Sequence, residues 1–534
     1  MLLVRTQLLL GGRIYTPTAP DATAMAVTDG VVSWTGEDRT GRALHPGAEE
    51  IDLGGAFVAP AFVDTHVHTT ALGLALIGLD LSGCTSRLDC IERVREHVRR
   101  SSEPIVWGHG WDDSVWADGG AVLTSDLDEV APGRNVYLTR IDAHSAACST
   151  PLRRASGITE SSTGFHPQEP LTADAHHLVR TTARALLSSE VRAHARSSAL
   201  DLAASRGICA VHECGGPEIS GVRDFRELLA ADHGVEVRGY WGQAVADAES
   251  ARAIIAETGA HGLAGDLFVD GSIGSHTAWM TESYADLAGT GTTFQDVDAI
   301  AAHLDACTDA GIQAGFHAIG DGAVGAVVDA FERVATRVGG PALASLGHRI
   351  EHLEMVTEGQ AQKLAAWGVI GSMQPMFDAL WGGDGGLYSF RLGADRARDM
   401  NPFARLASAG MSLAFGSDAP VTEVDPWAMV RAAVHHRTEG SSISPRAAFS
   451  AATRGAWRAG GVRDGLAGTL VPGAPASYAI WDVDELVVRA PADTVARWST
   501  DPRAGVPALP ALDADSVPPG CLRTVHRGRV IHEA

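Results

Sequence analysis

Two histidines separated by one residue, His66 and His68, are the strongest chemical signal in this chain. They follow the apolar run at 57–63, which predicts a buried strand. Because alternate side chains of a strand point to the same face, both imidazoles are expected to face one point, where they can bind a metal ion. Asp64 is placed to orient an imidazole. The alternative is that two histidines end an ordinary core strand, so the metal hypothesis needs further ligands.

Three later segments supply further candidate ligands. Each is an apolar run that ends in a residue of a metal-binding type, namely His317, His352 and Asp418. In a (β/α)8 barrel the reactive groups come from the carboxyl ends of the strands, so this arrangement is typical of that fold. Several histidines with a carboxylate suit zinc or a similar divalent ion. A lone histidine is better interpreted as a core residue, but a set of them at successive strand ends favours a metal site.

Asp418 is the candidate general base. A divalent ion at these strand ends would lower the pKa of a bound water to about 7 and would polarise a carbonyl group. Asp418, last on its predicted strand, would take the proton of that water and pass it to a leaving nitrogen.

Several motifs occur together in a characteristic order. They are Pro-x-Phe-Val-Asp-Thr-His-Val-His at 60–68, His-Ala-Ile-Gly-Asp at 317–321, Arg-Ile-Glu-His at 349–352, Ser-Met-Gln-Pro at 372–375 and Gly-Ser-Asp-Ala-Pro at 416–420. In combination they resemble the metal-dependent amidohydrolase superfamily. Gly-Trp-Asp at 110–112, Asp-Ala-His-Ser at 142–145 and Phe-Val-Asp-Gly-Ser-Ile-Gly-Ser at 268–275 resemble its branch with the YtcJ-type proteins and N-substituted formamide deformylase. The resemblance runs from about Leu8 to Asp482.

The resemblance raises the question of one or two metal ions. Many members bridge two ions through a carboxylated lysine at the end of the fourth strand, but Lys363 is the only lysine here and lies in a predicted helix after the His352 strand. Asp266 stands where relatives often have that lysine, so a lysine bridge is excluded. Glu169, in a loop at 164–170 that resembles an element of this branch, is a hypothetical bridging ligand. An exposed loop glutamate is the alternative, and His166 is a weaker candidate.

Substrate contacts are predicted where Gly-flanked polar and aromatic residues follow strand-like runs. The alternative for the Gly-rich segment at 268–275 is that its polar residues only form a turn. The alternative for Trp111, in the segment at 110–112, is that its ring only packs in the core. The predicted set is Trp111, Asp112, His144, His212, Asp270 and Ser272. Ser275, Arg349 and Gln374 are weaker candidates for contacts with substrate or with the ligands.

The elements that must position these residues form an alternating α/β pattern. Eight strands are predicted, most of them separated by helical patterns, at 57–66, 208–212, 235–241, 266–270, 312–317, 349–352, 369–373 and 412–418. This alternation predicts a (β/α)8 TIM barrel over 59–462, with an insertion at about 76–180 after the first strand. Short strands at both ends predict a small composite β-sandwich domain from 1–58 and 463–534, which the resembled family also has.

Composition limits the partners. A formal net charge of −23 disfavours nucleic acid and anionic membranes, which would be repelled. No run of about 18 apolar residues occurs, and the N-terminus fits a strand pair better than a signal peptide. Seven scattered cysteines are then expected to be reduced, in the cytoplasm. We expect a small-molecule substrate, and a homodimer is a hypothesis that no residue pattern specifies.

These observations predict a metal-dependent hydrolase of a non-peptide C–N bond, an amide or an N-formyl group, with one or two divalent ions such as zinc. A deaminase or an ester or cyclic-amide hydrolase is the alternative within enzymes, because the same activated water attacks any of these carbons. A non-catalytic metal-binding barrel protein is the alternative outside enzymes. The presence of Asp418 and of the four histidines argues against it.

Overall fold

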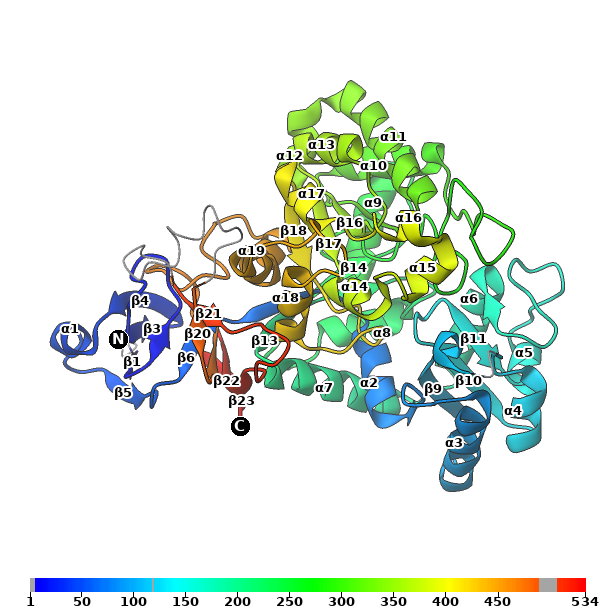
Figure 1. Cartoon of the computed structure of the whole chain (residues 1–534), viewed down its shortest axis with the longest axis horizontal. Helices are drawn as coiled ribbons and strands as arrows, with labels where there is room; N and C mark the ends of the chain where they lie inside the picture. The colour runs from blue at the N-terminus through cyan, green and yellow to red at the C-terminus, as the bar shows by residue number, and fades with distance from the viewer. Residues whose placement is uncertain (1–4, 118–119, 489–506) are drawn as a thin grey trace.

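The computed structural model describes residues 5–117, 120–488 and 507–534. Residues 1–4 and 489–506, which belong to the predicted composite domain, lie outside this described part. The chain has a mixed α/β fold with three regions along its long axis (Figure 1). A β-rich region made from both termini lies at one end, a central α/β region follows, and a second small sheet with its helices lies at the other end.

The central region is a set of parallel strands whose pairings return to the first strand. In order they are β7 (Phe62–Val67), β13 (Ile208–Gly215), β14 (Glu236–Trp241), β15 (Gly315–Ala318), β16 (Arg349–His352), β17 (Ile370–Met373) and β18 (Ser412–Phe415). Isolated parallel bridges connect β14 to β15 through residues 262–268, and Val67 to Ala419 connects the last strand back to β7. We call this arrangement the parallel ring. Its strands all end at one edge, which is where the predicted ligands lie.

Two predicted strands differ from the structure. The run at 57–66 is two strands, because β6 (Phe57–Pro60) pairs with β19 whereas β7 pairs with β13. The hydrogen-bond partner changes where the Ala61 amide donates to Ser477 and the Phe62 amide donates to Gly207. The segment at 266–270 forms no strand, since Phe268 makes only one isolated bridge to His317. A left-handed turn at Gly265 (φ +76°) bends the chain just before it.

Helices surround the parallel ring. They are α7 (Ser189–Ser205), α8 (Gly221–Leu229), α9 (Ala248–Thr258), α10 (Val297–Ala310), α11 (Asp321–Val338), α12 (Gly340–Leu346), α13 (Glu358–Ala366), α14 (Pro375–Trp381), α15 (Leu387–Leu392), α16 (Ala394–Ala397), α17 (Phe403–Ser408), α18 (Pro426–Val434), α19 (Pro445–Ser450), η2 (Ala451–Gly455) and α20 (Ala456–Ala459). No helix in the described ranges combines the length and apolar character needed to cross a bilayer.

Helix α11 shows how a surrounding helix holds a strand that carries a residue of the predicted site. Its apolar residues recur three or four apart, as in Val324, Val327, Phe331 and Val334, and this spacing places them on one buried face. The Phe331 ring packs edge-on against Phe316, the residue before His317, with 6.4 Å between ring centroids. Truncating a buried phenylalanine costs about 3–5 kcal/mol, so this contact contributes to holding β15 in place.

The terminal region has two sheets that share one apolar core. One sheet has β4 (Val31–Gly36), β3 (Ala24–Thr28), β1 (Thr6–Leu10) and β5 (Glu49–Asp52), and the other has β2 (Arg13–Ile14), β6, β19 (Tyr478–Asp482), β22 (Gly520–His526) and β23 (Arg529–Glu533). Helix α1 (Asp38–Leu44) and the pair β20 (Leu486–Val487) and β21 (Leu509–Pro510) complete it. Leu9, Met25, Val58 and Ile480 belong to one buried cluster, so residues far apart in the sequence are packed together.

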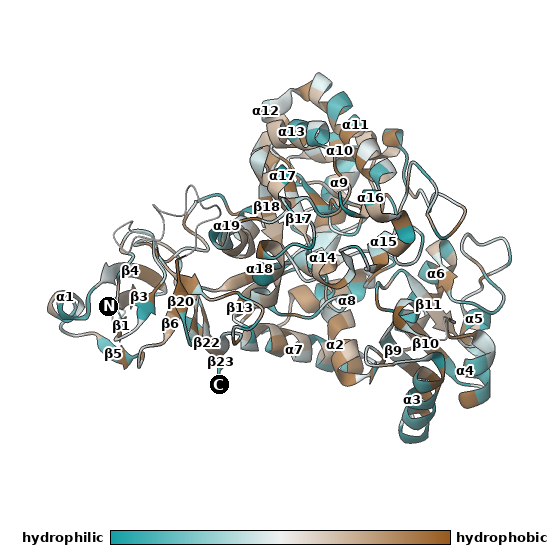
Figure 2. Cartoon of the chain, viewed as in Figure 1, coloured by the Kyte–Doolittle hydropathy of each residue, from teal (hydrophilic) through white to brown (hydrophobic). Residues whose placement is uncertain are grey.

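The insertion is a separate sheet between β7 and β13. It contains α2 (Thr69–Ile77), β8 (Leu79–Asp80), α3 (Arg87–Arg100), β9 (Ile105–Trp111), η1 (Asp113–Val115), α4 (Thr124–Val130), β10 (Asn135–Arg140), β11 (Ser145–Cys148), α5 (Thr150–Ala155), β12 (Leu171–Thr172) and α6 (Ala173–Ala185). Helix α3 is largely hydrophilic on its outside (Figure 2), and it buries Cys90, Ile91 and Val94. Strands β9 and β10 and helix α6 carry residues that line cavities beside the ring.

Candidate metal centre

Six ligand-type side chains converge at the carboxyl edge of the parallel ring: His66, His68, Asp266, His317, His352 and Asp418. Asp266 joins the two histidines of β7, with 3.3 Å from its Oδ1 to His66 Nε2 and 3.2 Å from its Oδ2 to His68 Nε2. Asp418 Oδ1 lies 3.2 Å from His68 Nε2 and 3.5 Å from His66 Nε2. His352 Nε2 is 4.0 Å from Asp266 Oδ1.

These spacings fit a divalent metal ion. Two ligand atoms at about 2.1 Å from a tetrahedral ion lie about 3.4 Å from each other. Three atoms of the cluster, His66 Nε2, Asp266 Oδ1 and Asp418 Oδ1, are also buried and have no hydrogen-bond partner among the described residues. Buried polar atoms are normally paired, so a convergent group of unpaired ones indicates a site that can bind a cation.

The electrostatics of the cluster also favour a cation. Burial by itself lowers the pKa of His68, but hydrogen bonds and charge interactions with Asp266 and Asp418 raise that pKa to about 9. Burial raises the pKa of Asp266, but His66 and His68 hold it well below its usual value. The carboxylates therefore keep the imidazoles protonated, and a bound divalent ion would displace those protons.

Neighbouring side chains orient the ligands. Glu351 Oε2 lies 2.9 Å from His66 Nδ1, and Gln374 Oε1 lies 2.8 Å from His352 Nδ1. Such contacts on the second ring nitrogen fix the orientation of a metal-binding imidazole. The expectation for Asp64 is corrected here, because its carboxylate accepts from the Ser417 hydroxyl at 2.6 Å and from backbone amides, not from an imidazole. It therefore fixes the segment that carries Asp418.

Backbone strain is concentrated at this edge. His352 has φ +71° and Asp418 has φ +57°, in the left-handed region that non-glycine residues rarely adopt. Each such residue costs of the order of 1–3 kcal/mol. Two ligand-type residues held in this way indicate that the side-chain directions at the site are enforced by the fold.

Of the predicted substrate contacts, His144 and Ser272 line a cavity beside the cluster. Burial, and then the charge of His317, lowers the pKa of His144, so its imidazole is neutral near pH 7. Ser272 donates to Asp142 Oδ2 at 2.8 Å. Asp270 accepts from the Ile319 and Gly320 amides at 3.0 and 2.8 Å. It also lies 3.5 Å from His317 Nδ1, so it positions a ligand rather than lining the cavity.

Three predicted contacts lie elsewhere and are corrected. Trp111 is buried in the insertion, where its Nε1 donates to the Leu138 carbonyl at 2.9 Å, so it is a packing residue. Asp112 accepts from Arg140 Nη2 at 2.7 Å and thus holds a cavity residue without lining the cavity. His212 lies inside β13, which continues to Gly215, and its Nδ1 is 3.1 Å from Arg349 Nη1.

Glu169 is also corrected. Its side chain is 61% exposed and lies 3.5 Å from His166 in the loop after α5, outside the cluster of ligand-type residues. Arg153 anchors that loop by donating to the Glu169 carbonyl oxygen at 2.7 Å. Asp266, in contrast, lies inside the cluster and contacts both histidines of β7. Its location in the sequence, where related chains have lysine, was the signal that could have identified it.

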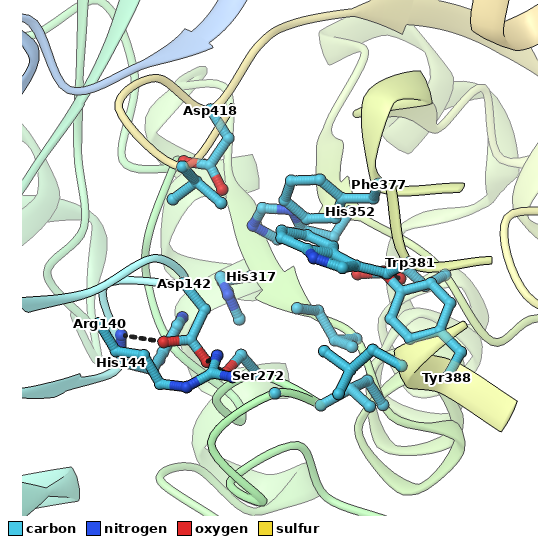
Figure 3. A pocket seen from close by; sticks show the side chains of 16 residues that line it. Arg140, Asp142, His144, Ser272, His317, His352, Phe377, Trp381, Tyr388 and Asp418 are labelled. Atoms are coloured by element: carbon cyan, nitrogen blue, oxygen red, sulfur yellow. Dashed lines mark hydrogen bonds and ion pairs between the residues drawn. The ribbon is translucent and has the colours of Figure 1, made fainter. Parts of the chain in front are cut away.

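The cavity beside the cluster has one polar and one aromatic wall (Figure 3). Arg140, Asp142, His144 and Ser272 gather on one side, Phe377, Trp381 and Tyr388 gather on the other, and His317, His352 and Asp418 lie between them. The aromatic residues come from α14 and α15, which follow β17. Sequence reasoning missed them, because nothing in their local pattern distinguishes a cavity wall from core packing.

Known proteins resemble this chain over most of its length. A model of the amidohydrolase family matches residues 49–532. The chain is 28% identical to the protein LONG AFTER FAR-RED 3 of Arabidopsis thaliana, over 90% of this chain and 88% of that one. It is 27% identical to the YtcJ protein of Bacillus subtilis, over 82% and 84%. It is also 27% identical to the N-substituted formamide deformylase of Arthrobacter pascens, over 31% of each.

Among solved structures, an uncharacterized metal-dependent hydrolase from Pyrococcus furiosus matches with a TM-score of 0.69 and 27% identity. The match covers 90% of this chain and 99% of that one. Together with the family match, it confirms the resemblance that the sequence motifs indicated.

Proposed function

The chain belongs to the amidohydrolase family, and on that premise we propose that it hydrolyses the C–N bond of an amide or an N-formyl group, not of a peptide. The reaction uses a divalent metal ion, for which zinc is the first candidate. The observation that carries the proposal is the convergence of buried, unpaired His66, Asp266 and Asp418 atoms at the strand ends. The short match to a formamide deformylase supports the bond type.

In this proposal His66, His68, Asp266, His317 and His352 hold the metal. When bound, the ion supplies an activated water and polarises the substrate carbonyl. Asp418 Oδ1, at 3.2 Å from His68 Nε2, accepts the proton of the attacking water and then delivers it to the leaving nitrogen. His144, a neutral imidazole on the cavity wall, donates a hydrogen bond that orients the carbonyl oxygen.

The proposal also covers the domain organisation, the kind of substrate and the cellular location. We take the parallel ring as the (β/α)8 barrel of 59–462, and the two terminal sheets as the composite β-sandwich of 1–58 and 463–534. The substrate is a small molecule that enters the cavity beside the cluster, and the enzyme works in the cytoplasm. The closed order of parallel pairings and the apolar core shared by the terminal sheets support these assignments.

The test is a metal analysis of the purified protein combined with a panel of amide, N-formyl, ester and cyclic-amide substrates. His66→Ala and His68→Ala should each lose most bound metal and all turnover while the protein stays folded. His194→Ala, at an exposed position of α7, is the matched control and should change neither. Full metal content with normal turnover in either cluster variant contradicts the proposal, and hydrolysis of esters alone moves it to the alternative reaction.

A further inference from the structure

A second cavity adjoins the metal centre and shares Asp142 and His144 with the first cavity. It shares His68, Asp266, His317, His352 and Asp418 with the cluster, so a molecule inside it reaches the reacting atoms. Three aromatic side chains line it: Trp107 and Tyr137, whose ring centroids lie 4.5 Å apart, and Phe268. Two arginines of helix α6, Arg180 and Arg184, also line it.

The two arginines lack the partners that buried guanidinium groups need. Arg180 is only 8% exposed, and its Nε donates to the Glu218 carbonyl at 2.9 Å, but its Nη2 is buried without a partner. Arg184 has a buried, unpartnered Nε, and its guanidinium lies 5.8 Å from the Trp107 ring centroid. Within the described ranges, neither arginine forms an ion pair with a carboxylate.

Two other buried arginines of the chain, by contrast, pair with carboxylates. Arg140, which lines the first cavity, pairs with Asp112 at 2.7 Å and with Asp142 at 3.2 Å. Arg196, on α7, pairs with Glu227 at 3.1 Å. Glu218, Asp224 and Glu213 act on these two arginines only through longer-range charge interactions. A buried or partly buried charge without a directly bonded carboxylate is costly, so two adjacent guanidinium groups in a protein of net charge −23 indicate a site for an external anion.

We propose that Arg180 and Arg184 bind a carboxylate of the substrate, so that the substrate class is an N-acyl or N-formyl compound with a carboxylate on an apolar spacer. A carboxylate fits because its two oxygens accept paired N–H donors of guanidinium groups. The aromatic wall lies along the same cavity and takes the spacer, while the metal centre takes the scissile group. This inference rests on the proposed function for the scissile bond, but the anion site itself does not depend on turnover.

The first test therefore measures binding to the metal-loaded full-length protein by calorimetry, with phenylacetate and its neutral analogue phenylacetamide. We expect phenylacetate to bind at least ~10-fold more tightly, the scale of charge-assisted hydrogen bonds. The double variant Arg180→Gln/Arg184→Gln should lose this preference. Arg154→Gln, at an exposed position of α5, should keep it.

Equal binding of both probes to the wild type overturns the inference. An unchanged preference in the double variant also overturns it, because phenylacetate would then be held by the metal alone. Arg180→Lys/Arg184→Lys keeps both charges and should retain part of the preference. This variant guards against a folding defect of the glutamine double variant, which is checked through its metal content and circular dichroism.

The second test measures kcat/KM for a series of N-formyl-ω-amino acids of increasing length and for their carboxamides. The double glutamine variant should lose at least ~10-fold in kcat/KM for the acids, mainly through KM, and little for the carboxamides. A wild type that cleaves neither series contradicts the proposed function, while the phenylacetate experiment still decides the anion site. A wild type that prefers the carboxamides overturns the carboxylate assignment.

Discussion

Replacing Asp266 with asparagine removes one negative charge from the metal centre and hardly changes the side-chain size. Its two carboxylate oxygens lie 3.3 Å from His66 Nε2 and 3.2 Å from His68 Nε2, so it contacts both imidazoles of β7. A neutral amide can still accept hydrogen bonds, but it is a weak ligand for a divalent cation. Asp266→Asn is therefore expected to weaken metal binding without unfolding the protein.

The magnitude follows from the effect on His68. Burial lowers the pKa of His68, so raising that pKa from 6.5 to about 9 takes at least about 3 kcal/mol of attraction to Asp266 and Asp418 for one positive charge. We assign half of this attraction, about 1.5 kcal/mol, to each carboxylate. A divalent cation carries twice the charge, so its attraction to Asp266 is about 3 kcal/mol. Metal affinity should accordingly fall about 100-fold.

The assay is competition with a chelator of known affinity, together with the metal content of protein purified under identical conditions. Glu169→Gln is the matched control, because it makes the same change of charge in an exposed loop, and it should leave affinity and stoichiometry unchanged. The reasoning is refuted if Asp266→Asn binds metal as tightly as the wild type, or if Glu169→Gln lowers the stoichiometry.

Asp418→Asn should keep substantial metal but lose at least ~100-fold in kcat, as expected for a general acid/base, and an unmoved acid limb of the pH profile would assign the proton transfer to another group. Lys363→Arg should leave turnover unchanged and indifferent to bicarbonate, because Lys363 is exposed and pairs with Glu332 at 2.8 Å; a bicarbonate requirement contradicts this. Glu236→Gln tests the contact between the parallel ring and β22. Burial raises the pKa of Glu236, but the hydrogen bond with His526 brings it to about 2, below its usual 4.5. The carboxylate thus stabilises the fold above about pH 4.5 and less as pH falls toward 2. The Tm difference between wild type and Glu236→Gln should shrink over that interval, and a constant difference would exclude this interaction.

The sequence by itself determined the ligand types and the edge on which they meet. His66 and His68 share a face because side chains alternate along a strand, and His317 and His352 lie at the ends of parallel strands. These are local rules, so one chain suffices to apply them. The order of contiguous motifs likewise identified the family, because each motif lies within a few residues.

Other assignments depended on which distant segments pack together. The sequence indicates Asp266 as a replacement for lysine but does not predict its contact with the histidines of β7, since its segment forms no strand and reaches β7 only through the curvature of the ring. Trp111 and Glu169 occur in suitable motifs, yet packing within the insertion buries one and leaves the other exposed.

Arg180 and Arg184 of α6 show most clearly that a sequence pattern does not predict contacts between distant segments. Arg180 and Arg184 follow an ordinary helical spacing of four residues, which predicts that they share a face but not what that face contacts. Only the docking of the insertion against the ring puts them in a cavity with Asp266 and Asp418, where neither forms an ion pair with a carboxylate of the described residues. Backbone periodicity sets the local direction of a side chain, whereas its burial, partners and charge balance come from contacts between segments distant in sequence.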